Sequence, residues 1–133
     1  MDREIVLAFH CGAEVSMNIV GGKYKISILW HLIDSTLRYN EIQKAIPQAT
    51  PKMLSQQLKE LEADGIINRT LYPVVPPKTE YSLTELGQTV VPIVKALCEW
   101  GNAYLEQAGI PIPWEKRTIL SDATDPVPKG DLI

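Results

Sequence analysis

The stretch from Thr50 to Gly65 limits the fold more than any other part of the sequence, because it carries two helix-end signals around one apolar stripe. Threonine followed by Pro51 is a typical helix start, since the threonine caps free N–H groups and proline fits the first turn. Glycine is a typical helix stop. Three leucines recur between these signals at helical spacing, namely Leu54, Leu58 and Leu61. The pattern predicts an amphipathic helix from Pro51 to Asp64 with one buried face.

The opposite face of this helix is predicted to be polar and basic. At about 100° per residue, four side chains project together away from the leucines. They are Lys52, Ser55, Gln56 and Lys59. Lysine can bind phosphate or guanine, glutamine can pair with adenine, and serine is adaptable. The first turn, which begins at Thr50 and Pro51, is the part of a DNA-reading helix that usually meets base edges. The same pattern is also typical of an ordinary solvated helix face. The elements on either side of the helix are therefore needed to distinguish a DNA-binding face from a solvated one.

A short helix is expected directly before this one. Asn40 and Gln43 have the spacing of a capping box, and Pro47 ends the helix at about Ile46. Two short helices joined by a few residues are typical of a helix-turn-helix.

A β-hairpin is expected directly after it. Residues 66–72 and 79–83 alternate as strands do, and the proline-rich segment 73–78 forms the tip. This order predicts an α+β, mainly α-helical fold, a winged helix-turn-helix with a two-stranded wing. Arg69 and Lys78 on the hairpin are expected to hold phosphates beside the reading helix.

The two ends of the chain are expected to supply dimerisation helices. Two N-terminal helices, from about Cys11 to Val20 and from Lys23 to Leu32, are separated by paired glycines. Near the other end, Thr84 caps a long helix from Glu85 to about Ala108, which Pro92 is expected to kink. Its inward stripe is predicted to be Leu86, Val90, Ile93, Val94, Leu97, Gly101, Tyr104 and Leu105. So wide an apolar surface predicts cover by a second copy of the chain. We expect one winged-helix and dimerisation domain, 1–108, and an irregular tail, 109–133.

The charge of the chain is unevenly distributed. The net charge is −3, which on its own argues against DNA binding. Between Val20 and Glu80, however, there are eight basic and six acidic residues, so the acidic excess belongs to the two ends of the chain. Phosphates respond to the local field, so the total does not exclude a DNA partner. The chain has no run of 18 apolar residues, and we expect a cytoplasmic protein without a membrane partner.

These residues together resemble the HxlR-type transcriptional regulators, a winged-helix group related to MarR. The similar segments are IVGGKYKISIL, RYNEIQKAIP, TPKMLSQQLKELEADGIINRTLYPVVPPKTEYSLTELG and ALCEWG. The resemblance implies a homodimer joined through its N-terminal and C-terminal helices, a recognition helix at Pro51–Asp64 and a wing at Pro73–Lys78. It implies binding of double-stranded DNA at inverted repeats and control of neighbouring genes. Tyr24 stands where the family often has Trp, and Gly12 where Pro often follows the cysteine.

Cys11 has two open interpretations. It matches the N-terminal cysteine with which several members of the resembled family sense oxidants, aldehydes or quinones. Sensing needs an exposed thiolate, which a helix N-terminus favours, and a small-molecule or electrophile effector would act there. The alternative is an inert thiol in a dimer interface.

Enzymatic function is not expected. His10 and Cys11 are adjacent, but no other cysteine or histidine has metal-ligand spacing, and no catalytic constellation or cofactor motif stands out. The alternative to a DNA-binding regulator is a winged-helix protein-protein interaction module without a specific DNA target, which the acidic ends favour.

Overall fold

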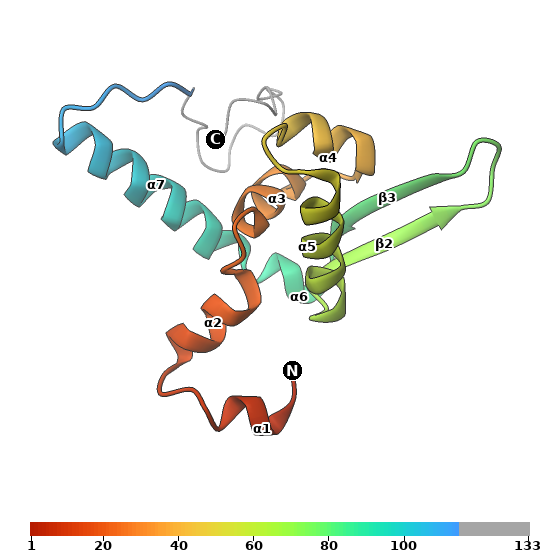
Figure 1. The fold of residues 1–133 in the computed structure, drawn as a ribbon. Coiled ribbons are helices and arrows are strands. Elements are labelled where there is room, and N and C mark those ends of the chain that lie inside the picture. Colours follow the sequence, from red (N-terminus) through yellow and green to blue (C-terminus); the bar gives the residue numbers. More distant parts are fainter. Residues whose placement is uncertain (115–133) are drawn as a thin grey trace.

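The computed structural model describes residues 1–114, and Figure 1 shows a central group of helices from which the other elements project. The helices are α1 (Arg3–Val6), α2 (Gly12–Val20), α3 (Lys25–Leu32), α4 (Tyr39–Ala45), α5 (Pro51–Ala63), α6 (Glu85–Gln88) and α7 (Val91–Gln107), and the strands are β1 (Leu37–Arg38), β2 (Ile67–Tyr72) and β3 (Lys78–Leu83). Helices α3, α4 and α5 stand together in the centre. The β2–β3 hairpin projects to one side, α7 projects to the other, and α1 and α2 extend below (Figure 1).

The predicted hairpin is part of a small three-stranded antiparallel sheet with the order β1-β3-β2. Ile67 pairs with Leu83 at its base, and Tyr72 pairs with Lys78 near its tip. The two residues of β1 add a third strand, which pairs Leu37 with Tyr81. The winged helix-turn-helix fold is therefore confirmed, with one short strand more than the wing itself.

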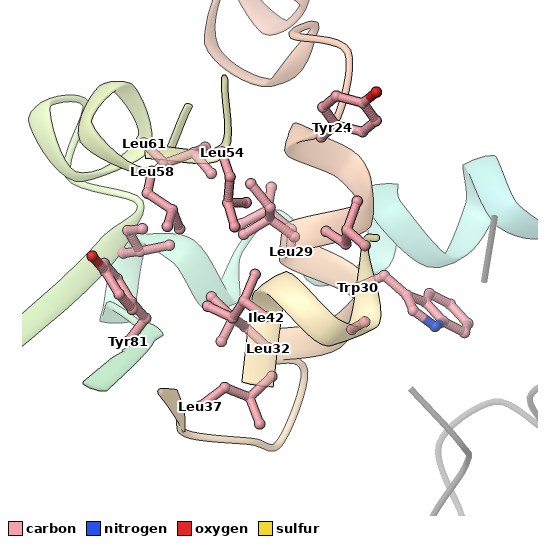
Figure 2. Packing of buried hydrophobic residues seen from close by; sticks show 14 of the residues in the cluster. Tyr24, Leu29, Trp30, Leu32, Leu37, Ile42, Leu54, Leu58, Leu61 and Tyr81 are labelled. Atoms are coloured by element: carbon pink, nitrogen blue, oxygen red, sulfur yellow. The ribbon is translucent and has the colours of Figure 1, made fainter. Parts of the chain in front are cut away.

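The core lies between the three central helices and the base of the sheet. All three leucines of the α5 stripe are 2% exposed or less. They point toward Leu29 of α3 and Ile42 of α4, with Tyr81 of the sheet at one side (Figure 2). Burying apolar surface at about 25 cal/mol per Å² is the main stabilising term here. It fixes α5 with its opposite face outward.

Both ends of α5 follow their sequence signals. The Thr50 side chain accepts a 3.1 Å hydrogen bond from the backbone N–H of Met53, and Pro51 occupies the first turn. At the other end Asp64 caps the helix, and Gly65 has φ = 76°, a conformation that favours glycine. The predicted helix is confirmed, and its regular part ends one residue earlier than expected.

The predicted start of α4 is wrong by two residues. The cap is Arg38, whose backbone N–H donates a 2.9 Å hydrogen bond to the carboxylate of Glu41, and not the Asn40–Gln43 pair. The reason is β1, which ends at Arg38, so the chain turns from strand to helix without the loop that an Asn40 cap needs.

The prediction of a single long C-terminal helix is also wrong, because the chain forms two helices there. Thr84 caps the short α6 by accepting a 2.8 Å hydrogen bond from the N–H of Gly87, as expected. Helix α7 then begins at Val91 with Pro92 in its first turn. In one continuous helix the Pro92 ring would clash with the carbonyl of Gln88, whereas a first turn tolerates proline.

Helix α6 packs very closely on the start of the wing. A Cβ atom added to Gly87 would overlap the backbone carbonyl oxygen of Ile66. The Thr84 hydroxyl donates to the carbonyls of Gly65 (2.6 Å) and Ile66 (3.1 Å). The absent side chain at Gly87 thus allows two backbones to touch, which fixes α6 against the strand that begins the wing.

The stripe predicted for the C-terminal helix is largely on the surface. Val94 is fully buried, and Val90, Val91 and Cys98 pack partly against the core. The other large members of the surface are exposed: Leu86, Ile93, Leu97, Trp100 and Tyr104. The prediction that this stripe points inward is therefore wrong for a single chain, because most of its side chains are not buried by any other part of residues 1–114.

The remaining expectations for the chain ends have separate outcomes. None of the helices in residues 1–114 has the length and apolar character needed to cross a membrane. Residues 110–113 have no regular structure, and the rest of the expected tail, 115–133, lies outside the described residues. The division at residue 108 stays a prediction.

Candidate nucleic-acid interface

The outer face of α5 brings together the four side chains that the sequence places there. Lys52, Gln56 and Lys59 are exposed, and Ser55 is half-buried. All four line one open hollow, which Glu60 and Ala63 complete. The helix axis and the buried leucines hold this face outward, so two ammonium groups, a hydroxyl and a carboxamide are available to a partner.

The first turn of α5 is fixed to α4 by Tyr39. Its hydroxyl lies 3.2 Å from the carbonyl oxygen of Pro51 and 3.3 Å from the hydroxyl oxygen of Ser55. Nearby, the Gln43 amide donates a 2.9 Å hydrogen bond to the carbonyl of Ala49, in the turn between the helices. These contacts fix the position of the turn and of the first residues of the predicted DNA-binding face, including Thr50 and Pro51, which are both exposed.

The inner edge of α5 is fixed to α3 by Gln57, a residue that the sequence reading missed. Its side-chain carbonyl accepts a 2.8 Å hydrogen bond from the buried backbone N–H of Tyr24. The Tyr24 hydroxyl in turn donates a 3.2 Å hydrogen bond to the backbone carbonyl of Gln48. Position 57 lies about 60° from Leu54 on a helical wheel, on the buried side, and that angle is the signal that could have found it.

A second missed contact reaches the outer face itself. The Nζ atom of Lys25, whose side chain is 5% exposed, lies 2.7 Å from Oε1 of Glu60. The other carboxylate oxygen of Glu60 accepts a 3.3 Å hydrogen bond from the amide of Gln56. The hydrogen bond from Lys25 is the main reason why the pKa of Glu60 lies below its ordinary value.

The two basic residues of the wing are not brought together. Side chains alternate between the faces of a strand, so the register places Arg69, opposite Tyr81, on one face and Lys78, opposite Tyr72, on the other. Burial raises the pKa of Tyr81, and the neighbouring Arg69 partly offsets this effect. Lys78 lies 4.8 Å from the centre of the Tyr72 ring and 3.9 Å from the carboxylate of Glu80.

The two cysteines have opposite environments. Cys11 is exposed, and it is the N-cap residue of α2 without a side-chain hydrogen bond in that role. Cys98 is partly covered, and burial raises the pKa of its thiol to about 11. Among the described residues there is no group of three or more His, Cys, Asp or Glu side chains that could hold a metal ion.

Comparison with known proteins agrees with this architecture. The profile of the HxlR-like helix-turn-helix family matches residues 19–109. An HTH-type transcriptional regulator of Methanothermobacter thermautotrophicus is 52% identical over 94 residues, which cover 71% of this chain and 72% of the relative. The HTH-type regulator YkvN of Bacillus subtilis is 48% identical over 99 residues, or 74% of this chain and 84% of the relative.

Solved structures show the same similarity. The redox regulator HypR in its reduced form has a TM-score of 0.71 and 44% identity, over 74% of this chain and 98% of that one. The regulator YodB of B. subtilis, in its reduced form, has a TM-score of 0.63 and 31% identity. The match covers 74% of this chain and 98% of YodB. The family expected from the residues is confirmed: the chain belongs to the HxlR-like helix-turn-helix family of DNA-binding transcriptional regulators.

Proposed function

We propose that this protein regulates transcription by binding an inverted repeat in double-stranded DNA as a homodimer, with α5 in the major groove. The observation that carries the proposal is the outer face of α5, where Lys52, Ser55, Gln56 and Lys59 line one open hollow. The buried leucines behind them hold this face of the helix outward. Phosphate contacts supply affinity, and contacts to base edges supply sequence preference.

The wing gives the second set of proposed contacts. Arg69 is exposed near the base of the hairpin, and Lys78 is half-buried near its tip. Because they lie on opposite faces of the hairpin, they would meet different phosphates. Their replacement should weaken binding on all sequences alike, since a phosphate carries no base information.

Dimerisation is supported by the uncovered apolar face of α7. Trp100 and Tyr104 stack there with ring centres 5.7 Å apart, and they are 69% and 58% exposed. Helix α1 likewise buries none of its residues. A two-fold partner that covers these surfaces would repeat α5, and DNA accepts two such helices about 34 Å apart, one helical turn. We propose residues 1–108 as this working unit, placed in the cytoplasm with the DNA.

The experiment that tests the proposal is a gel shift with the DNA upstream of the protein's own gene. It uses reduced, dimeric protein at low and moderate salt with competitor DNA. A shift that survives competitor and weakens steeply with salt supports the regulator, since released counterions make affinity salt-dependent. If no shift is seen, the alternative is favoured, namely a protein-protein interaction module. The net charge of −3 is consistent with that alternative.

A thiol response at Cys11 is a second part of the proposal. HypR is described as a redox regulator, and YodB has been treated with diamide. In this chain Cys11 is exposed at the start of α2, next to the loop that joins α1. Operator binding of the wild type and of Cys11→Ser should differ after diamide or methylglyoxal. An unchanged response in Cys11→Ser would leave Cys11 as an inert thiol.

A further inference from the structure

A chain of three side chains leads from the core to the reading face. The ammonium of Lys25 is buried at the start of α3 and lies 2.7 Å from Glu60 Oε1. The side chain of Glu60 is 45% exposed, and its Oε2 lies 3.3 Å from the side-chain nitrogen of Gln56. Gln56 and Glu60 are one helical turn apart on α5, and both line the hollow of the proposed DNA face.

The carboxylate determines which way the Gln56 amide points. An ionised carboxylate can only accept hydrogen bonds, so the group of Gln56 that faces it has to be the NH₂ and not the carbonyl. The Lys25 ammonium keeps Glu60 ionised and in place, because a carboxylate beside a buried positive charge is stabilised in its charged form. The carbonyl oxygen of Gln56 and its second N–H proton are left for a partner outside.

That orientation matters for base recognition. Glutamine recognises adenine with its carbonyl accepting from the N6 amino group and its NH₂ donating to N7. A free glutamine samples both amide orientations and many rotamers, whereas a held one presents a single pattern before DNA arrives.

We propose that Glu60, held by Lys25, is a positioning residue that orients the Gln56 amide and so sets the preference of the protein at one base pair in each half-site. This inference rests on the proposed function, because it assumes that α5 reads DNA. A negative charge on a DNA-binding face would otherwise only repel phosphates. Its ion pair with Lys25 offsets that repulsion, so the carboxylate can stay on this face.

The test measures base discrimination with the full chain. Wild-type protein first enriches a duplex from a random-sequence DNA library. Single-base substitutions of that duplex then identify the base pair at which Gln56→Ala no longer discriminates. The quantity compared is the ratio of affinities for the enriched duplex and for its substituted form at this base pair. Glu62→Gln is the matched control, because it removes the same charge from an exposed site of α5 that does not line the hollow.

We expect Gln56→Ala and Glu60→Gln each to lower this ratio about tenfold, which is about 1.4 kcal/mol. Glu60→Gln should add no further loss in the Gln56→Ala background, since both act through one contact. Lys25→Met should lower the ratio too, with thermal unfolding measured beside it. Loss of structure alone would weaken binding to both duplexes and leave their ratio unchanged.

Two results would overturn the inference. The first is a Glu60→Gln variant that changes affinity for both duplexes by one common factor, as Glu62→Gln is expected to do. The second is a Gln56→Ala variant that discriminates as the wild type does at every base pair. If the wild type enriches no sequence at all, the proposed function fails, and this inference fails with it.

Discussion

The side-chain carbonyl of Gln57 accepts the backbone N–H of Tyr24 at 2.8 Å, and this contact joins the proposed reading helix to α3 inside the protein. Tyr24 precedes the first turn of α3, where backbone N–H groups have no partner within the helix. A glutamine on the buried side of α5 thus satisfies a donor that the start of α3 leaves open.

Replacing Gln57 by leucine should therefore destabilise the fold. The substitution leaves the buried N–H of Tyr24 without its acceptor, which costs about 1–3 kcal/mol. Urea unfolding followed by circular dichroism measures the effect. Gln56→Leu, one residue earlier on the exposed face, is the control and should shift stability by less than about 0.5 kcal/mol. Equal midpoints for the two variants would show that the contact with Tyr24 is not stabilising.

The two lysines of the outer face should govern the salt dependence of DNA binding. Each phosphate contact that is lost lowers the slope of log affinity against log salt by about 1. Lys52→Gln and Lys59→Gln should each show this change, and Lys52→Gln should also relax base preference because it lies in the first turn. Fluorescence anisotropy across a salt series measures the slope.

Lys95→Gln is the charge-matched control for these lysines. Lys95 lies on α7, away from α5, so its loss should leave the salt slope unchanged. A slope that responds equally to Lys52, Lys59 and Lys95 would mean that binding follows net charge and not the outer face of α5.

The apolar face of α7 should control the oligomeric state. Leu97 is 47% exposed in the single chain, and an aspartate there would bring an unpaired charge into a dimer interface. Leu97→Asp should be monomeric at micromolar concentration in sedimentation velocity, whereas the wild type should be a dimer. Leu71→Asp makes the same change on the wing, at a leucine that is 55% exposed, and should stay dimeric. A dimeric Leu97→Asp would contradict the proposed interface.

Cys98 should make stability depend on pH in the alkaline range. Burial raises the pKa of its thiol from 9.0 to about 11, so the folded protein holds the thiol proton more tightly than the unfolded chain. This stabilising contribution is complete below about pH 9 and is lost as the pH rises through about 11. The difference in unfolding free energy between wild type and Cys98→Ala should shrink over that window. A difference that is constant with pH would show that burial does not hold the thiol proton.

Sequence patterns predicted the parts of this fold whose signals are local. Thr50, Pro51 and Gly65 act within one or two turns of α5, and the leucine spacing depends only on helix geometry. The hairpin was equally readable, because strand alternation changes to a proline-rich tip at Pro73. The outer face of α5 followed from the same helical wheel, since whatever lies opposite a buried stripe must face outward.

The missed features depend on residues that are distant in sequence. Two residues, Leu37 and Arg38, carry no strand signal of their own, and they become a strand only because β3 offers a free edge. The shifted start of α4 follows from that pairing. Lysine and glutamine are usually exposed, so their residue types argue against burial of Lys25 and Gln57, and only the helical-wheel position of Gln57 points the other way. Their partners lie 35 and 33 positions away in the chain, and only the packed fold brings them together.

The close packing at Gly87 links the β2–β3 hairpin to the helices at the C-terminal side of the molecule. Because α6 touches the carbonyl of Ile66 directly, the root of the wing and the short helix before α7 form one closely packed piece. Only Thr89 and Val90 separate that piece from α7, which we propose to pair with the second copy. A methyl group at position 87 would therefore change the position of the proposed dimer surface relative to the hairpin that we propose to flank the DNA, although it lies far from either proposed contact.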